Sequence, residues 1–593
     1  MPGVPRTAMS SDSPASMPLT QGQLSIWFAQ ALAPRDPAYN IGECIEIGGK
    51  LATDKFERAL RHAVAATDAL NLRFADGEAG PRQWVAHDPD WELVRLDLGG
   101  DDPEQAAADW MRRDMAIPFC LEGDRLFRFA LLRLSRERYF WYAVNHHIIN
   151  DGVGWRLLQR RVAEAYTALC EDRALPPADA GAWRDIVAEE RAYKGSDHYR
   201  RDRAFWMAQL ADAPPRVTLS SEPPRPPQGF VKTTGYLPHS VDLEDMAQRH
   251  GASAAAVFAA AAGIYVHRMT GATAMMIGLP MAARVGGRSR STVGMAANAV
   301  PLRLAIDAAD SIGSVIAETG RGMRAAVRHQ RYRLEDIRRD QGLAPSDPDI
   351  CGTYVNFTPF EQDIRFAGHS MLNRPLGNWR LEDLQLVYYG GTEPSGQRVD
   401  VVANAAVYSE ADTEQHCRRF LDLLRQLASA KTDAPVRSIA LLSPAERHTI
   451  LEDWSGQDHP IPAATVCDLF EQQAHRHAAA VALVSGARSM SYGELAEQAS
   501  RLAGCLAARG SVPWRRVVRQ VPRRAEATPG KRRRVAADIR RGRAVSRLRP
   551  RHRQPRPRPA RLWPDLHPVC RTHGRGLSHA AGPAAHPDLR RGI

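Results

Sequence analysis

The stretch Arg138–Leu158, RYFWYAVNHHIINDGVGWRLL, decides the fold. Its first part, Tyr139–Val144, is aromatic and β-branched, which predicts a strand that is buried on both faces. Apolar residues then recur every three to four positions from Trp155 to Leu169, which predicts an amphipathic helix. Between the strand and the helix lie two imidazoles, a carboxylate and a glycine, namely His146, His147, Asp151 and Gly152. Such a junction has the chemistry of a site rather than of a core.

Each of these residues also has a purely structural interpretation. Asp151 could cap the helix that begins near Val153. Either histidine could be a half-buried ring whose nitrogens are satisfied by neighbours. Gly152, which lacks a Cβ, would let backbone or a ligand approach closely. The joint spacing His-His-x-x-x-Asp-Gly is more informative than any single position, because four positions are fixed at once.

This spacing resembles the signature of the condensation-domain superfamily, which includes the condensation and epimerisation domains of nonribosomal peptide synthetases and relatives such as wax ester synthases. Other stretches resemble further condensation-domain motifs: LTQGQLSIWFAQAL at 19–32, the strand at 70–74, the segment 293–303 with Asn298 as its distinctive polar residue, and the strand at 354–357. The segment 329–335 resembles the sixth motif, although Arg331 and Leu334 stand where the family has an acid and an aromatic residue. The resemblance covers residues 18–451.

The first of these motifs also makes a structural prediction. Thr20 is placed to cap a helix whose Leu24, Trp27, Phe28 and Leu32 form one face.

The resemblance implies a mixed α/β (α+β) fold of two chloramphenicol-acetyltransferase-like lobes that form a V-shaped pseudo-dimer, with His147 in a tunnel between them. It implies that His147 is catalytic and that His146 is a scaffold residue. It also implies that Asp151 meets Arg284 from the other lobe in a structural ion pair, which would lower the pKa of the aspartate. Asn298 and Gly152 complete the motif residues.

The same resemblance gives the expected reaction. An acyl or peptidyl thioester donates to the amino group of an aminoacyl thioester, and both are carried on phosphopantetheine arms that partner carrier proteins supply. A neutral imidazole can act as general base or can donate a hydrogen bond to the tetrahedral intermediate. No covalently bound cofactor and no metal are expected, and residues that would bind a cofactor are not identified. The expected partners are donor and acceptor peptidyl or aryl carrier proteins and other synthetase modules.

Composition changes sharply along the chain. We expect a disordered start (1–17), a first lobe (18–180), a second lobe (181–440), a linker (441–464) and a fragment at 465–510 that resembles the opening of an adenylation domain. No phosphate loop or adenylate-binding motif follows, so adenylation activity is not expected. Residues 511–593 hold 23 basic against four acidic residues, with 11 Pro and no Tyr or Phe, which predicts a disordered or out-of-frame tail.

The net charge of +12 therefore lies in this tail, and the remaining chain is mildly acidic. Such a distribution argues against a folded nucleic-acid-binding domain. No stretch has the length and apolarity of a membrane span or of a secretory signal, so a cytoplasmic location is expected. The eight cysteines form no C-x-x-C pair, which argues against a zinc site.

The pattern 19–39, the histidine loop and the segment 328–332 most resemble the condensation domains of enterobactin-type siderophore synthetases. Three alternatives remain open at this stage. One is an epimerisation domain, and another is an acyltransferase of the superfamily that acts on a free amine or alcohol. The third is an inactive, truncated synthetase fragment that only docks carrier proteins.

Overall fold

The computed structural model describes residues 16–177, 181–287, 289–344, 347–358, 364–377, 381–393, 396–455 and 464–509. The chain divides into two compact units, Met1–Asp458 and His459–Ile593. The expected basic tail lies outside the described residues, and so does nearly all of the expected N-terminal segment. Order was expected from Pro18, but the described chain begins at Ser16 and Met17 already pairs with Gln83.

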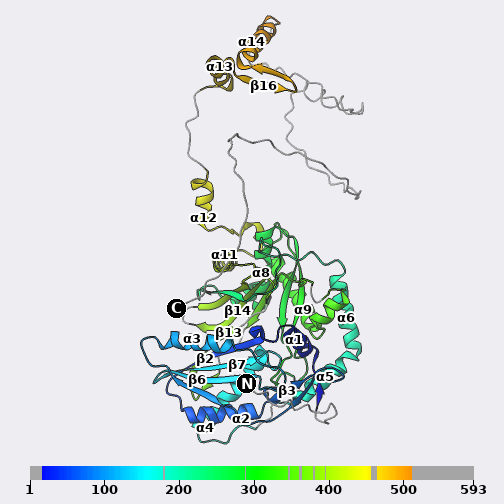
Figure 1. The fold of residues 1–593 in the computed structure, drawn as a ribbon, viewed down its shortest axis with the longest axis vertical. Coiled ribbons are helices and arrows are strands. Elements are labelled where there is room, and N and C mark those ends of the chain that lie inside the picture. Colours follow the sequence, from blue (N-terminus) through cyan, green and yellow to red (C-terminus); the bar gives the residue numbers. More distant parts are fainter. Residues whose placement is uncertain are drawn as a thin grey trace, which may run out of the picture. The chain divides into compact units, whose positions relative to one another are not determined.

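The first lobe of the larger unit is built on a six-stranded sheet (Figure 1). Its strands, in spatial order, are β12 (Arg365–Phe366), β13 (His369–Gly377), β2 (Asn40–Gly48), β7 (Arg138–His146), β6 (Phe127–Ser135) and β5 (Leu93–Asp97). Neighbouring strands are antiparallel except for the parallel pair β5 and β6. A small sheet beside it holds β1 (Met17–Pro18), β4 (Arg82–Val85) and β3 (Leu72–Ala75).

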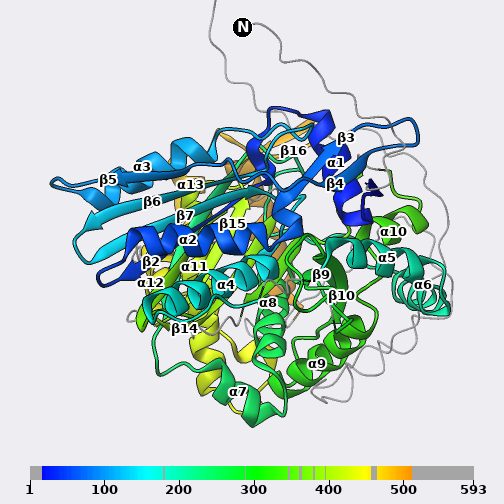
Figure 2. The same cartoon turned by 90° about the horizontal axis from the view of Figure 1, so that it is seen from below.

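Helices cover both faces of strand β7, as the sequence predicts. Trp141 packs edge-on against Phe56 of α2 (Thr53–Ala65), while the next residue, Tyr142, packs edge-on against Trp110 of α3 (Pro103–Met115). Because successive strand residues point to opposite faces, α2 and α3 lie on opposite sides of the sheet. Helix α4 (Gly152–Cys170) packs beside α2 (Figure 2).

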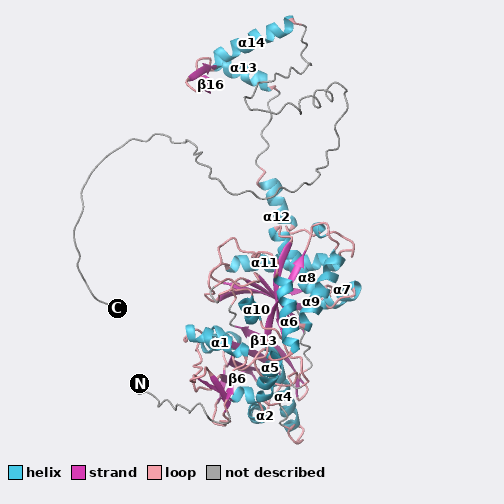
Figure 3. Cartoon of the chain, turned by 90° about the vertical axis from the view of Figure 1, so that its right-hand side faces the viewer, coloured by secondary structure: helices cyan, strands magenta, loops and turns pink. Residues whose placement is uncertain are grey.

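The second lobe has its own six-stranded sheet. Its strands, in spatial order, are β10 (Asn298–Ala305), β9 (Ala274–Met281), β11 (Thr353–Thr358), β14 (Leu384–Glu393), β15 (Gly396–Asn404) and β8 (Phe230–Leu237). The helices α7 (Leu243–His250), α8 (Ala254–Thr270) and α9 (Ile312–Arg328) pack together beside these strands (Figure 3), and α11 (Glu410–Ser429) packs on β8 and β15. The alanine-rich α8 is buried along most of its length, which its small side chains predict.

The two lobes are not consecutive stretches of chain, and this corrects the expected boundaries. Strand β13, from the second half of the sequence, pairs with β2 of the first sheet over seven residues, from Met371 to Gly377. Helix α5 (Trp183–Lys194) places Trp183 and Val187 in the first core. A division at residue 180 places β13 in the wrong lobe. Pairing between strands that are distant in the sequence leaves no local pattern from which it could be predicted.

Helix α1 (Gln21–Leu32) begins where the sequence predicts, with Thr20 in a capping box with Gln23. Its predicted apolar face is wrong in part. Phe28 and Leu32 are 57% and 88% exposed, whereas Ile26 and Trp27 are buried. Helix α1 therefore turns a more polar side to the core than its apolar spacing suggests.

Three further helices, α6 (Asp197–Leu210), α10 (Leu334–Asp340) and α12 (Pro444–His448), belong to the larger unit. None of the described helices is by itself long and apolar enough to span a bilayer; only α7 and α8 taken together, bent by 92°, reach that composition.

The smaller unit contains α13 (Val466–Arg476), β16 (Val481–Ser485), β17 (Arg488–Ser491) and α14 (Tyr492–Ala508). Within its described residues, 464–509, only Ala474 is buried. Apolar side chains such as Val466 and Val484 are 83% and 72% exposed. The described part of this unit therefore has no buried core.

Candidate active site

Two histidines and an aspartate lie in the loop that joins β7 to α4. The strand ends at His146, and the helix begins at Gly152 with Asp151 as its N-cap. One carboxylate oxygen of Asp151, Oδ1, accepts a hydrogen bond from the backbone N–H of Gly154 at 2.9 Å. The capping interpretation of Asp151 is therefore correct.

The predicted ion pair is confirmed as well, because Asp151 uses its second oxygen for it. Oδ2 lies 2.8 Å from a guanidinium nitrogen of Arg284, and both side chains are buried. The backbone N–H groups of Ala296 and Ala297 donate to the same oxygen, each at 2.9 Å. Arg284 also donates to the carbonyl oxygen of Gly294 at 2.8 Å. The carboxylate thus ties the start of α4 to the connection between β9 and β10.

These contacts decide the charge of Asp151. Burial alone would favour the neutral acid, but Arg284 and the N–H donors outweigh it, so the pKa of Asp151 is lowered from its usual value. The carboxylate is ionised at neutral pH and fully engaged. Its position is architectural, as the sequence predicts.

His146 is buried and both of its ring nitrogens are occupied. Nδ1 accepts the backbone N–H of Ile148 at 3.2 Å, and Nε2 lies 3.1 Å from Oε1 of Gln30, to which it donates. Burial, together with the neighbouring His147, lowers the pKa of His146 to about 3. This ring is neutral at physiological pH and holds the loop against α1.

His147 is only partly buried, and one of its nitrogens is open. Nδ1 lies 2.7 Å from the carbonyl oxygen of Asn150. A carbonyl can only accept, so Nδ1 carries a proton, and in the neutral ring Nε2 presents a lone pair. The backbone N–H of His147 donates to the carbonyl of Tyr39 at 2.8 Å, which fixes the loop to the start of β2.

His147 lines a cavity of about 470 Å³. Its walls come from both lobes. Strands β2 and β13 and helix α4 supply one side, and strands β11, β14 and β15 supply the other. Lining residues include Ile41, Glu43, Gly152, Trp155, Arg156, Asn356, Thr358, Asn373, Gln385, Tyr389 and Arg398.

Gly152 lines this cavity, and one part of its predicted role is wrong. A Cβ at this position would meet no protein atom within 4 Å, so no neighbouring backbone requires a glycine here. The tight position is Gly154, where a Cβ would clash with Oδ1 of Asn150 and would lie 3.0 Å from the backbone nitrogen of Gly294. The open space at Gly152 belongs to the cavity.

Asn298 lies at the start of β10 and holds a neighbouring turn. Its amide donates to the carbonyl oxygens of Gln330 and Tyr332 at 2.8 and 2.9 Å, and its Oδ1 accepts from the N–H of Leu334 at 3.1 Å. The side chain therefore fixes the segment that resembles the sixth motif. It does not line the cavity that holds His147.

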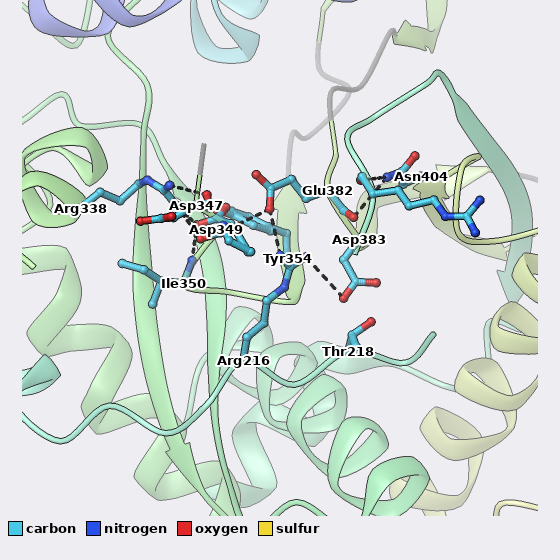
Figure 4. A network of polar contacts seen from close by, with 12 residues as sticks. Arg216, Thr218, Arg338, Asp347, Asp349, Ile350, Tyr354, Glu382, Asp383 and Asn404 are labelled. Carbon is cyan, nitrogen blue, oxygen red and sulfur yellow. Dashed lines mark hydrogen bonds and ion pairs between the residues drawn. The ribbon is translucent and has the colours of Figure 1, made fainter. Parts of the chain in front are cut away.

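A polar network secures the far wall of the cavity (Figure 4). Tyr354, which lines the cavity from β11, donates to a carboxylate oxygen of Asp349, and the N–H of Asp349 donates to Glu382 at 2.7 Å. Arg216 pairs with Glu382 at 2.9 Å. Burial, with Glu382 nearby, raises the pKa of Asp349. The network joins the starts of the parallel strands β11 and β14.

Several polar residues of the cavity wall were not recognised from the sequence, and Glu43 is the clearest. On β2 it shares a face with Ile41, Ile45 and Ile47, since alternate residues point the same way. A carboxyl group on an otherwise apolar strand face was the available signal. Burial raises the pKa of Glu43 to about 7, against the opposing effects of Asn373, Arg156 and Arg398.

Among the described residues, no three His, Cys, Asp or Glu side chains gather in a way that could hold a metal ion.

The profile of the Condensation domain family matches residues 14–451, about three quarters of the chain. The chain belongs to the condensation-domain family. The chain is 37% identical over 511 residues to a dimodular nonribosomal peptide synthase of Bacillus subtilis (strain 168), covering 86% of this chain and 21% of that protein. It is 26% identical over 516 residues to enterobactin synthase component F of Escherichia coli O157:H7, covering 86% of this chain and 39% of that protein. The chain thus spans only about a fifth to two fifths of these relatives.

Solved condensation domains share the fold. The starter condensation domain of rhizomide synthetase, in a complex with C8-CoA, aligns with a TM-score of 0.67 and 34% identity over 72% of this chain and 98% of that one. The first condensation domain of the calcium-dependent antibiotic synthetase, in complex with a substrate analogue, aligns with a TM-score of 0.68 and 35% identity over 73% of this chain and 100% of that one. The expected two-lobed, chloramphenicol-acetyltransferase-like α/β fold is confirmed.

Proposed function

We propose that this condensation domain forms an amide bond in nonribosomal peptide synthesis. The donor is an acyl or peptidyl thioester and the acceptor is the amino group of an aminoacyl thioester. Each is carried on the phosphopantetheine arm of a carrier protein, and no covalently bound cofactor takes part. The observation that carries this proposal is a partly buried imidazole, His147, which lines a cavity whose walls come from both lobes and which has only its Nδ1 hydrogen-bonded among the described residues.

In the proposed reaction, the acceptor amine attacks the donor carbonyl carbon, a C–N bond forms and the C–S bond breaks. The amine must lose a proton, and the departing sulfur leaves as a thiol. Because Nδ1 of His147 donates to Asn150, its Nε2 is the acceptor of that proton. This tautomer favours proton acceptance by His147 over hydrogen-bond donation to the oxyanion. The thioester already supplies activation, so no covalent nucleophile is required.

We also propose carrier proteins and other synthetase modules as partners, with a siderophore-type product as one candidate. The similarity to enterobactin synthase component F supports that candidate. The fragment 465–510 is proposed to be the start of an adenylation domain, since the alignment to the dimodular synthase is longer than the condensation match. The cytoplasmic location stays a prediction.

The test is an amide-forming assay with purified protein, a donor-loaded carrier protein and an acceptor-loaded carrier protein, with mass spectrometric detection of the product on the acceptor arm. Product should require both carriers, and an acceptor whose amino group is acetylated should give none. Transfer to a free alcohol or a free amine, but not to a loaded carrier, would overturn the proposal in favour of another acyltransferase of the family. Carrier binding without transfer would favour an inactive docking module.

A further inference from the structure

The cavity that holds His147 also has a polar region away from the imidazole. Glu43 lies three residues along β2 from Asn40, the strand partner of His146. At about 3.3 Å per residue, this places Glu43 ~10 Å along the strand from the histidine loop. Glu43 therefore lies along the cavity wall, away from the loop that carries the imidazole.

Three acceptor oxygens in this part of the wall are buried and have no partner among the described residues. They are Oε2 of Glu43, Oδ1 of Asn373 and Oε1 of Gln385. They come from β2, β13 and β14, so both lobes contribute. The amide of Asn373 already serves Glu43 as a hydrogen-bond donor, which leaves Oδ1 of Asn373 as the free end. Buried acceptors without donors are costly, and three of them on residues that line one cavity favour a ligand that donates.

The charged residues of the same wall limit the net charge that the side group of the ligand can have. Arg156 and Arg398 lie close enough to act on the ionisation of Glu43, and Arg398 is itself paired with Asp400 at 2.6 Å. A cationic side group would be repelled by these two guanidinium groups. An anionic side group would be repelled by the three acceptor oxygens. A neutral group that carries O–H or N–H donors avoids both penalties.

On the basis of the proposed function, we infer that Glu43, Asn373 and Gln385 form a side-group pocket that selects a thioester substrate bearing a neutral hydrogen-bond donor, a hydroxyl or a carboxamide. A hydrocarbon side group of the same size leaves the three oxygens unpaired.

The test compares isosteric pairs of N-acetylcysteamine derivatives, serine against 2-aminobutyrate and asparagine against leucine. Each is offered with a free amine, as an acceptor, and N-acetylated, as a donor. Binding is measured by calorimetry with amide analogues that cannot react, and turnover is measured with the thioesters. In the wild-type protein at least one polar member should bind about tenfold or more tightly than its isostere, because the isostere leaves buried acceptors unpaired.

Two substitutions test the residues. Glu43→Leu removes the acceptor and should reduce the preference to about threefold or less, and its melting temperature is measured alongside to show that the variant folds. Glu43→Gln keeps the shape and the bond from Asn373 but presents N–H groups in place of the free oxygen, so it should also lose the preference. The matched control is Glu46→Leu, on the opposite face of β2, where the carboxylate pairs with Arg138 and Arg374. It should keep the preference.

Each outcome separates this inference from the proposed function. Amide formation without any preference within the pairs, or a preference that survives in both Glu43 variants, overturns the pocket and leaves the proposed function standing. If the analogues bind with a preference that depends on Glu43 but no amide forms, the pocket is supported and the proposed function is overturned. Failure of every analogue to bind overturns the pocket.

Discussion

The two sides of the loop between β7 and α4 are built in opposite ways. On the closed side, His146 and Asp151 have every polar atom of their side chains engaged. On the open side, His147 and Gly152 line the cavity, and the described residues offer Nε2 of His147 no hydrogen bond. Residues that stand together in one motif therefore divide into those that hold the loop and those that can meet a substrate. Four predictions test this division.

The largest effect is expected on the closed side, for Arg284→Met. This change leaves the Asp151 carboxylate buried without its cation, which typically costs about 3–5 kcal/mol of the free energy of unfolding. Chemical denaturation measures it. The double variant Asp151→Asn with Arg284→Met removes the orphaned charge and should recover part of the loss. A single variant within about 1 kcal/mol of wild type would show that the pair does not hold the lobes.

On the open side, His147→Ala should lower the rate of amide formation by about a hundredfold or more, the usual cost of a lost polar catalytic contact. The free energy of unfolding should stay within about 1 kcal/mol of wild type, because only one ring nitrogen is bonded. Single-turnover kinetics and denaturation on the same preparation measure both quantities. A twofold change in rate would remove the catalytic assignment.

The glycines give a matched pair across the same division. Gly154→Ala forces a methyl group against Asn150 and the backbone of Gly294, and should destabilise the fold by about 1–3 kcal/mol. Gly152→Ala places its methyl group in the cavity and should change the stability by less than about 0.5 kcal/mol. Thermal denaturation distinguishes the two. Equal losses would mean that Gly152 is packed as tightly as Gly154.

The last prediction concerns pH. The folded pKa of His146, about 3, lies below the unfolded value of 6.5, so the unfolded chain binds more protons between these values. This residue therefore contributes stability that is complete above pH 6.5 and is lost as the pH falls toward 3, by at most about 1.4 kcal/mol per pH unit. The variant His146→Gln should show a shallower decline than wild type between pH 6 and 4 in urea denaturation. Parallel curves would mean that the ring is protonated in the fold.

Sequence reasoning succeeded where the chemistry is local or the motif is specific. The strand, the helix, the cap by Thr20 and the pair between Asp151 and Arg284 were all predictable. The two interpretations of Asp151, cap and ion pair, proved compatible because a carboxylate has two oxygens.

Other features depend on tertiary packing and could not be read from spacing. Apolar periodicity identified α1 but not the side that packs, and Phe28 and Leu32 remain exposed. The pairing of β13 with β2 has no local signal. Glu43 was detectable in the sequence as a charged residue on an apolar strand face. Asn373 and Gln385 line the same cavity only because the sheets fold together, so no local pattern predicts them.

The exchange of β13 also has a consequence for how the protein is made. Arg374 donates to Glu46 across a sequence separation of 328 residues, so the first sheet lacks an inner strand until the ribosome has passed residue 377. Contacts of such long range slow folding, because the intervening chain must first be brought together. While it waits, β2 is an exposed edge that can pair with other chains. During synthesis the N-terminal half therefore carries an open sheet edge until residues 371–377 have been added.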